Sequence, residues 1–343
     1  MNNPAFDYPR DDARSIDSPT NPTRPVLNRR AMGAGSLAAI GSGTLAAIGT
    51  SALDRTPAGA DDVRQSDASP GWIRKSLKLN MIGTGDSLEA KFAIAKSCGF
   101  EGVEPNLPID PKTLTAMKTA ATNTGLIVDG SVGGYHWKIR HTDPSADVRD
   151  EAATLLRRGI EQTAELGGDT FLLVPGRGDD GDPEQTQRFA IDAIEGVLES
   201  AKSSGVVIAI ENVWNRMFYD PDGGSNQTAD ALARFVDAFD SGVGVQFDLG
   251  NHWKFGDVAG WVRTLGDRIV KLDIKGFNRQ SNRFTKINES DIDWQSVRAA
   301  LAEIGFTGWA AAEVRGGDAE RLREVANAME NTLRCSSYVT AER

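Results

Sequence analysis

The sequence has no excess of basic residues, only three histidines and two cysteines, and no long apolar run beyond residue 60. Its 48 Asp and Glu residues outnumber its 38 Lys and Arg residues, which gives a net charge of −10 at pH 7. Binding to nucleic-acid phosphates needs a basic surface, so we expect no nucleic-acid partner. A membrane-spanning helix needs about 18 consecutive apolar residues, so we expect no span after residue 60. The remaining composition, 40% hydrophobic and 25% charged, is typical of a globular protein.

The first 60 residues differ from the rest and resemble a twin-arginine export signal. Residues 1–28 are polar and contain five prolines. Arg29 and Arg30 then precede a weakly apolar Ala/Gly-rich run, and Ala58-Gly59-Ala60 fits a small-x-small cleavage site. Met32 stands where an aromatic residue is usual, and a disordered tail or an uncleaved anchor helix are the other interpretations. We expect export to the periplasm or another extracytoplasmic location, without a lipid anchor because no cysteine follows the apolar run.

The rest of the chain alternates strand-like and helix-like segments. Residues 61–76 are predicted to be a linker, residues 77–335 one domain, and residues 336–343 a C-terminal tail. Several helical patterns end in glycine, which supplies a left-handed cap. Strands are expected at 77–82, 102–105, 126–131, 170–175, 206–211, 243–248, 269–274 and 309–313, and helices include 88–98, 147–166, 185–203, 228–239 and 294–304.

Eight such units in about 260 residues predict an α/β fold of the (β/α)8 TIM-barrel type. A doubly wound sheet is the alternative architecture. It would normally carry a glycine-rich phosphate loop after its first strand, and Ile82-Gly83-Thr84-Gly85 matches that loop only in part.

Four of the predicted strands end in a carboxylate: Glu211, Asp248, Asp273 and Glu313. Parallel strands of a barrel direct their carboxyl ends to one mouth, so these four side chains should converge. Converging carboxylates repel one another unless a cation lies between them. Oxygen ligands are preferred by hard divalent metals, so the pattern predicts a site for such an ion.

The segments Ile210-Glu211-Asn212, Phe247-Asp248 with Asn251, Lys271-Leu-Asp273-Ile-Lys275 and Ala312-Glu313 resemble the sugar phosphate isomerase/epimerase family of xylose isomerase-like barrels. The resemblance covers roughly residues 77–335. It implies one divalent metal, Mn²⁺ or Mg²⁺ above all, and two glutamates that transfer protons. By that resemblance Glu211 and Glu313 are ligands and catalytic groups, and Asp248 is a ligand.

This sequence departs from the family pattern on the seventh strand. The family commonly has His-x-Lys-Asp there, whereas this chain has Asp273-Ile-Lys275-Gly276. Asp273 therefore stands where the imidazole would be, and an all-oxygen site favours Mg²⁺ or Mn²⁺ over Zn²⁺. Three histidines are also too few for the multi-zinc endonucleases built on the same barrel.

Other residues at the predicted mouth are candidates for catalysis or substrate binding. Lys275 lies two residues after Asp273, so both point to one face, where the lysine could stabilise an enediolate oxygen. His136 follows the third strand and is a candidate for binding a substrate hydroxyl or relaying a proton. The predicted substrate-binding residues are Trp137, Trp214 and Trp253 as stacking platforms, together with Asn251, Glu104 and Arg177.

The sequence thus predicts a metal-dependent isomerase or epimerase that acts on a free sugar or keto-sugar by abstracting a proton α to a carbonyl. A lyase or dehydratase on a keto-sugar or inosose would share that first step. A non-catalytic carbohydrate-binding barrel would not need both Glu211 and Glu313. The oligomeric state stays open, with a homo-oligomer among the options. Cys98 and Cys335 could form a disulfide, because the first and eighth helices of a closed barrel are neighbours, and two free thiols are the alternative, because neighbouring helix axes are about 8–10 Å apart.

Overall fold

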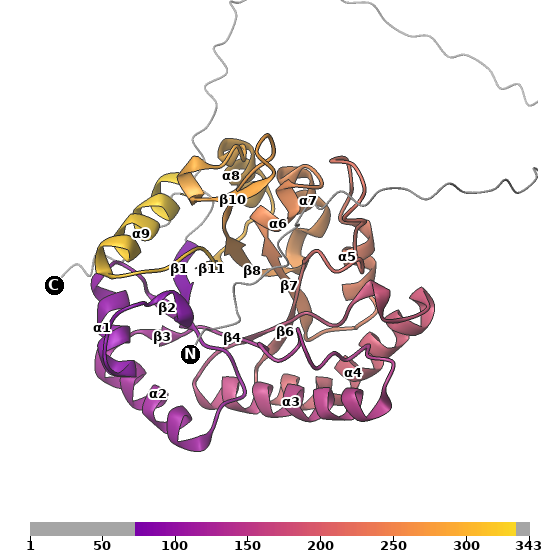
Figure 1. Ribbon diagram of the computed structural model, residues 1–343, viewed down its shortest axis with the longest axis horizontal. Helices are drawn as coiled ribbons and strands as arrows, with labels where there is room; N and C mark the ends of the chain where they lie inside the picture. The colour runs from indigo at the N-terminus through magenta and orange to yellow at the C-terminus, as the bar shows by residue number, and fades with distance from the viewer. Residues whose placement is uncertain (1–72, 334–343) are drawn as a thin grey trace, which may run out of the picture. The chain divides into compact units, whose positions relative to one another are not determined.

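The computed structural model of the chain describes residues 73–333 (Figure 1). The expected export signal, most of the expected linker, the C-terminal tail and Cys335 lie outside the described residues. Cys98 is buried, and its thiol donates to the carbonyl oxygen of Ala319 at 3.3 Å. Within the described part, no helix combines the length and apolarity needed to cross a bilayer.

The predicted barrel is confirmed by a nine-stranded sheet in which all paired neighbours run parallel. The strand order is β3-β2-β1-β11-β8-β7-β6-β5-β4. The two end strands are consecutive in the chain, and Asn106 bridges to Val132, so the sheet closes on itself. The strands are β1 (Ile73–Lys78), β2 (Gly102–Glu104), β3 (Ile127–Val128), β4 (Ser131–Val132), β5 (Thr170–Leu173), β6 (Val207–Glu211), β7 (Val243–Asp248), β8 (Ile269–Ile274) and β11 (Gly308–Ala312).

The third predicted strand is interrupted, for a reason that lies inside the barrel. Between β3 and β4, the Asp129 carboxylate accepts from Ser76 Oγ at 2.6 Å and contacts Lys271 Nζ. Gly130 follows, and a Cβ there would lie 3.0 Å from Lys271 Nζ and closer still to Thr170. The chain turns here to bring a carboxylate to a buried lysine, and only glycine leaves room for that turn.

Helices form a ring around the strands (Figure 1). Several begin at a side chain that accepts from the first free backbone N–H groups, among them Ser87, Asp110 and Asp182. Their apolar faces pack on the outside of the sheet through buried residues such as Phe92 and Trp261. The helices are α1 (Leu88–Ser97), α2 (Pro111–Thr124), α3 (Ala146–Glu165), α4 (Pro183–Ser203), α5 (Asp230–Val236), α6 (Leu249–Trp253), α7 (Val258–Leu265), α8 (Trp294–Glu303) and α9 (Ala319–Leu333).

Further features differ from the sequence prediction. The first strand was expected to reach residue 82, but β1 ends at Lys78 and Leu79–Met81 form a short 3-10 helix. β1 begins at Ile73 rather than Leu77, because Lys75 and Ser76 pair with β11 and so belong to the barrel instead of the linker. A short antiparallel hairpin, β9 (Gly276–Asn278) and β10 (Arg283–Thr285), follows β8 and was not expected. Its two phenylalanines pack against Trp214, so contacts with another loop support it.

Candidate active site and metal centre

The four predicted carboxylates meet at one point. Glu211 ends β6, Asp248 ends β7, Asp273 lies near the end of β8, and Glu313 follows β11. One oxygen from each lies within 4.8 Å of the others. The register explains the convergence: Asp248 pairs directly with Asp273, and the backbone N–H of Glu313 donates to Ile274 at 3.0 Å. The first three side chains are buried, while that of Glu313 is 26% exposed.

Lys275 lies among these carboxylates. Its Nζ is 2.7 Å from Asp248 Oδ2 and 2.8 Å from Glu313 Oε2. The expectation that Lys275 points to the same face as Asp273 therefore agrees with its position. The ammonium group offsets part of the charge of two predicted ligands and lies where a developing oxyanion would need a cation.

Lys78, which the sequence analysis did not select, is a second lysine of the site. Its Nζ lies 2.5 Å from Glu104 Oε2 and 2.9 Å from Asp273 Oδ1. Its strand also contains Arg74, Lys75 and Ser76, so nothing in the local sequence distinguished Lys78. Its partners are 26 and 195 positions away in the chain, so sequence reasoning had no means to pair them.

Glu104, at the end of β2, is fully buried. Its Oε1 lies 2.5 Å from Lys271 Nζ, and its Oε2 contacts Lys78 Nζ. Gln246 Nε2 also donates to Glu104 Oε1 at 3.2 Å. These contacts give Glu104 a structural role, and its contact with substrate stays a prediction.

Asn251 likewise lies behind the carboxylates. Its backbone N–H donates to Asp248 Oδ1 at 2.7 Å, and its side-chain Nδ2 lies 3.4 Å from Glu211 Oε1. Asn212 donates from Nδ2 to the backbone carbonyl of Asp248 at 2.9 Å. These contacts orient two predicted ligands, and the contact of Asn251 with substrate stays a prediction.

The surroundings of the site shift the pKa values of its two glutamates in opposite directions. Burial raises the pKa of Glu211 well above its usual value, and the charges of Glu313 and Asp273 raise it further. Burial also acts to raise the pKa of Glu313, but Lys275 and then Lys78 outweigh it, so that pKa lies below its usual value. In the metal-free protein the surroundings thus disfavour the charged form of Glu211 and favour that of Glu313.

The same environment tests whether a divalent metal fits. Burial raises the pKa of Asp273 to about 7 against the opposing charge of Lys78, and that of Asp248 to about 6 against Lys275. The raised pKa values mean that the ionised forms of Asp273 and Asp248 stay disfavoured despite the charges of Lys78 and Lys275. An ion bound at about 2.1 Å from each ligand spans oxygens up to roughly 4.2 Å apart, so the observed 4.8 Å needs only a small contraction. Donor type, spacing and uncompensated charge all fit a hard divalent ion.

His136 is buried beside the site in a defined tautomer. The backbone N–H of Val174 donates to Nδ1 at 3.2 Å, so in the neutral ring the proton is on Nε2. Burial, with smaller contributions from His141 and Lys78, lowers the pKa of His136 to about 3. The ring is therefore neutral at pH 7. Of its two predicted roles, this favours donation of a hydrogen bond to a substrate oxygen over relay of a proton through a charged imidazole.

The three predicted tryptophan platforms have different surroundings. Trp137 is 44% exposed, which suits contact with a ligand. Trp214 donates from Nε1 to the carbonyl of Asn251 at 2.9 Å and stacks on Phe284. Trp253 donates to Asp291 at 2.5 Å and lies under the guanidinium of Arg279. Trp214 and Trp253 thus hold the loops around the mouth together, and Trp137 is the platform that the geometry favours.

Arg177 lies in the loop before α4, and its side chain is exposed. Its backbone N–H donates to Thr142 Oγ1 at 3.0 Å. Nothing in these contacts decides whether the guanidinium binds an anion, so that role stays a prediction.

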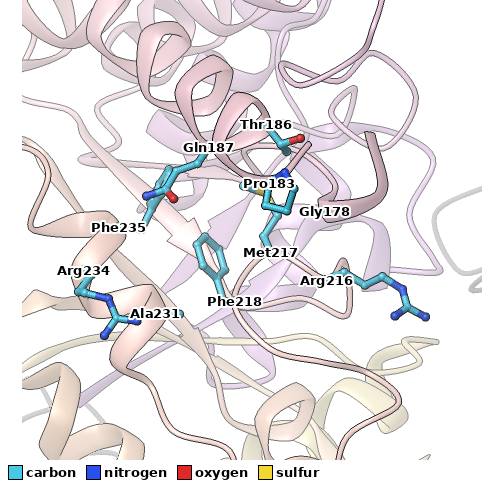
Figure 2. A pocket seen from close by; sticks show the side chains of 10 residues that line it. All are labelled: Gly178, Pro183, Thr186, Gln187, Arg216, Met217, Phe218, Ala231, Arg234 and Phe235. Carbon is cyan, nitrogen blue, oxygen red and sulfur yellow. The ribbon is translucent and has the colours of Figure 1, made fainter. Parts of the chain in front are cut away.

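A cavity of about 190 Å³ lies elsewhere, beside α4 and α5 (Figure 2). Met217, Phe218 and Phe235 line it, together with the stem of Arg216, whose guanidinium points away and pairs with Asp222 at 2.7 Å. None of the four carboxylates lines this cavity, so it is distinct from the candidate active site.

Known protein families and curated sequences were compared with this chain. The sequence profile of the xylose isomerase-like TIM barrel matches residues 92–334. A search of curated proteins finds no match.

Solved structures resemble the chain at low sequence identity. A D-tagatose 3-epimerase-like protein superimposes with a TM-score of 0.64 and 19% identity, covering 76% of this chain and 98% of that one. The 3-keto-D-glucoside 4-epimerase YcjR from E. coli, in its apo form, gives 0.63 and 16%, with 77% and 100% covered. An L-ribulose 3-epimerase gives 0.64 and 18%, with 76% and 95% covered. At these identities the likeness shows a common fold.

Proposed function

Because the chain belongs to the xylose isomerase-like TIM barrel family, we propose that it is a metal-dependent sugar isomerase or epimerase. The observation that carries the proposal is the pair Glu211 and Glu313, which converge in one carboxylate cluster next to the ammonium group of Lys275. The names of the structural neighbours, which are epimerases of tagatose, ribulose and keto-glucoside type, support a carbohydrate substrate.

The proposed reaction begins with removal of a proton from the carbon next to a carbonyl. Glu313 accepts this proton, and Glu211 returns one from its own side of the substrate. Lys275 stabilises the negative oxygen of the intermediate, and Nε2–H of His136 donates to a substrate oxygen. Glu211, Asp248, Asp273 and Glu313 would hold the metal ion, which when bound polarises the carbonyl and makes the α proton more acidic.

An NMR experiment in D₂O tests the reaction class. The protein is incubated with Mn²⁺ and a panel of free sugars and 3-keto-sugars. Isomerisation or epimerisation should exchange the α proton for deuterium and give a product of unchanged mass apart from the label. A new alkene or diketone signal would identify the lyase or dehydratase instead. Absence of exchange and product across the panel would leave a carbohydrate-binding barrel and count against the proposal.

We also propose that residues 1–60 direct export of the folded protein by the twin-arginine route, on the strength of Arg29, Arg30 and the small-residue sequence at 58–60. A folded reporter fused behind residues 1–60 should reach the periplasm. Changing Arg29→Lys together with Arg30→Lys should hold it inside. Export that survives the double change would point to another route. Phosphorylated sugars are scarce outside the cytoplasm, so export would favour a free sugar or keto-sugar as substrate.

A further inference from the structure

A line of buried charges of alternating sign runs through the barrel interior to the candidate metal site. It consists of Asp129, Lys271, Glu104, Lys78 and Asp273, each 7% exposed or less. Lys271 Nζ contacts Asp129 and Glu104, and Lys78 Nζ contacts Glu104 and Asp273. Barrel interiors are normally filled by layers of apolar side chains, so a charged line here has a cost that some function must offset.

The line ends on the aspartate that occupies the position of the family's imidazole. Lys78 Nζ lies 2.9 Å from Oδ1 and 3.0 Å from Oδ2 of Asp273, so it faces both carboxylate oxygens. Gln246 Nε2 donates to Oδ1 at 2.9 Å. A carboxylate oxygen has two lone pairs, so Asp273 keeps acceptor capacity for an ion while these donors fix its orientation.

The contact between Lys78 and Asp273 affects the net charge of the proposed metal site. A divalent ion, four carboxylates and Lys275 sum to −1, whereas three carboxylates, a neutral imidazole and the same ion and lysine would sum to 0. Buried net charge is costly, and a lysine on the fourth carboxylate offsets part of this difference. Lys78 divides its charge between Asp273 and Glu104, and Glu104 in turn shares Lys271 with Asp129.

We propose that Lys78 is a positioning residue that orients Asp273 and offsets the charge by which this aspartate differs from the neutral imidazole it replaces. Lys78 and Asp273 then act as a coupled pair, and neither is functional at this position without the other. The inference rests on the proposed metal-dependent function for its purpose, but the pairing itself is a property of the metal-free protein.

A double-mutant cycle of Lys78→Met, Asp273→His and the double variant tests the proposal. Lys78→Met leaves Asp273 and Glu104 without their shared cation, and Asp273→His leaves Lys78 beside a neutral ring. Each single variant should lower the Tm of the metal-free protein, Lys78→Met by about 10 °C. The double variant should be about 5 °C more stable than the sum of the two losses predicts. Asp273→His should weaken Mn²⁺ binding on the order of 100-fold, and adding Lys78→Met should recover at least about tenfold of this, both measured by titration calorimetry.

Lys75→Met is the matched control. Lys75 is on the same strand and equally buried, but its Nζ pairs with Glu330 of α9 at 2.8 Å, outside the barrel. Combined with Asp273→His, it should give additive losses and no recovery of Mn²⁺ binding. Asp273→Asn, which keeps the shape of the side chain, provides a second cycle with Lys78→Met if the histidine variant does not fold.

Additive losses of Tm in the Lys78 cycles would overturn the proposal, as would a double variant that binds Mn²⁺ no better than Asp273→His. The metal-free Tm cycle needs neither metal nor substrate. A protein that shows coupling between Lys78 and Asp273 but turns over no sugar would therefore disprove the proposed function and leave the pairing intact.

Discussion

Turnover of the sugar substrate is expected to fall on the order of 10²- to 10⁴-fold when either Glu211 or Glu313 is replaced by glutamine, because each substitution removes a proton-transfer group. The two variants should differ in stability. The raised pKa of Glu211 shows that the metal-free site disfavours its charge, so Glu211→Gln, which removes that charge, should leave the Tm of the metal-free protein unchanged or raise it. Glu313→Gln loses the ion pair with Lys275 and should lower it. Initial rates and thermal melts of the purified variants measure both effects.

Glu330→Gln is the control for this pair of substitutions. It makes the same chemical change at a carboxylate that pairs with Lys75 on the outer side of the barrel. Its activity should match that of the unaltered protein. If Glu211→Gln or Glu313→Gln keeps near-normal turnover with the barrel folded, the role assigned to that residue is wrong.

Removal of divalent metal is expected to abolish turnover reversibly and to lower the Tm. Protein purified without chelator should contain about one equivalent of metal, because residues 73–333 contain one cluster of four possible ligands. At a metal concentration of about 100 times Kd, binding stabilises the fold by about 2.7 kcal/mol, which corresponds to a Tm shift of roughly 5–10 °C for a domain of this size. Mn²⁺ or Mg²⁺ should restore both properties after chelation, and Zn²⁺ should do so less well because the site lacks nitrogen and sulfur ligands.

Asp248→Asn provides the control for the metal experiment. It removes one predicted ligand charge while keeping the side-chain shape and should abolish most of the Mn²⁺-dependent Tm shift. Metal-free protein whose melting temperature ignores Mn²⁺ in the unaltered chain would contradict the metal site. In that case Lys275, which already lies on Asp248 and Glu313, would be the cation of the cluster.

The barrel could be predicted from sequence because its signals are local. Apolar runs at 206–211, 243–248, 269–274 and 309–313 read as buried parallel strands, and the structure places β6, β7, β8 and β11 within one or two residues of those bounds. The predicted strand boundaries were wrong where tertiary contacts override the local hydrophobic pattern. Ile73 belongs to β1 because β11 pairs with it, and the third strand breaks because Asp129 turns inward to Lys271.

The sequence by itself determined that four carboxylates would meet at one barrel mouth, since parallel strands bring their carboxyl ends to the same edge. Only the tertiary structure decided which charges face them. Lys78 joins Glu104 and Asp273, and Lys271 joins Glu104 and Asp129, over separations of 26 to 195 residues. The sequence of a strand does not show whether a lysine in it points into the barrel, as Lys78 does, or out to a helix, as Lys75 does. The register and closure of the whole sheet assign each to its face, because a shift of one residue exchanges the two.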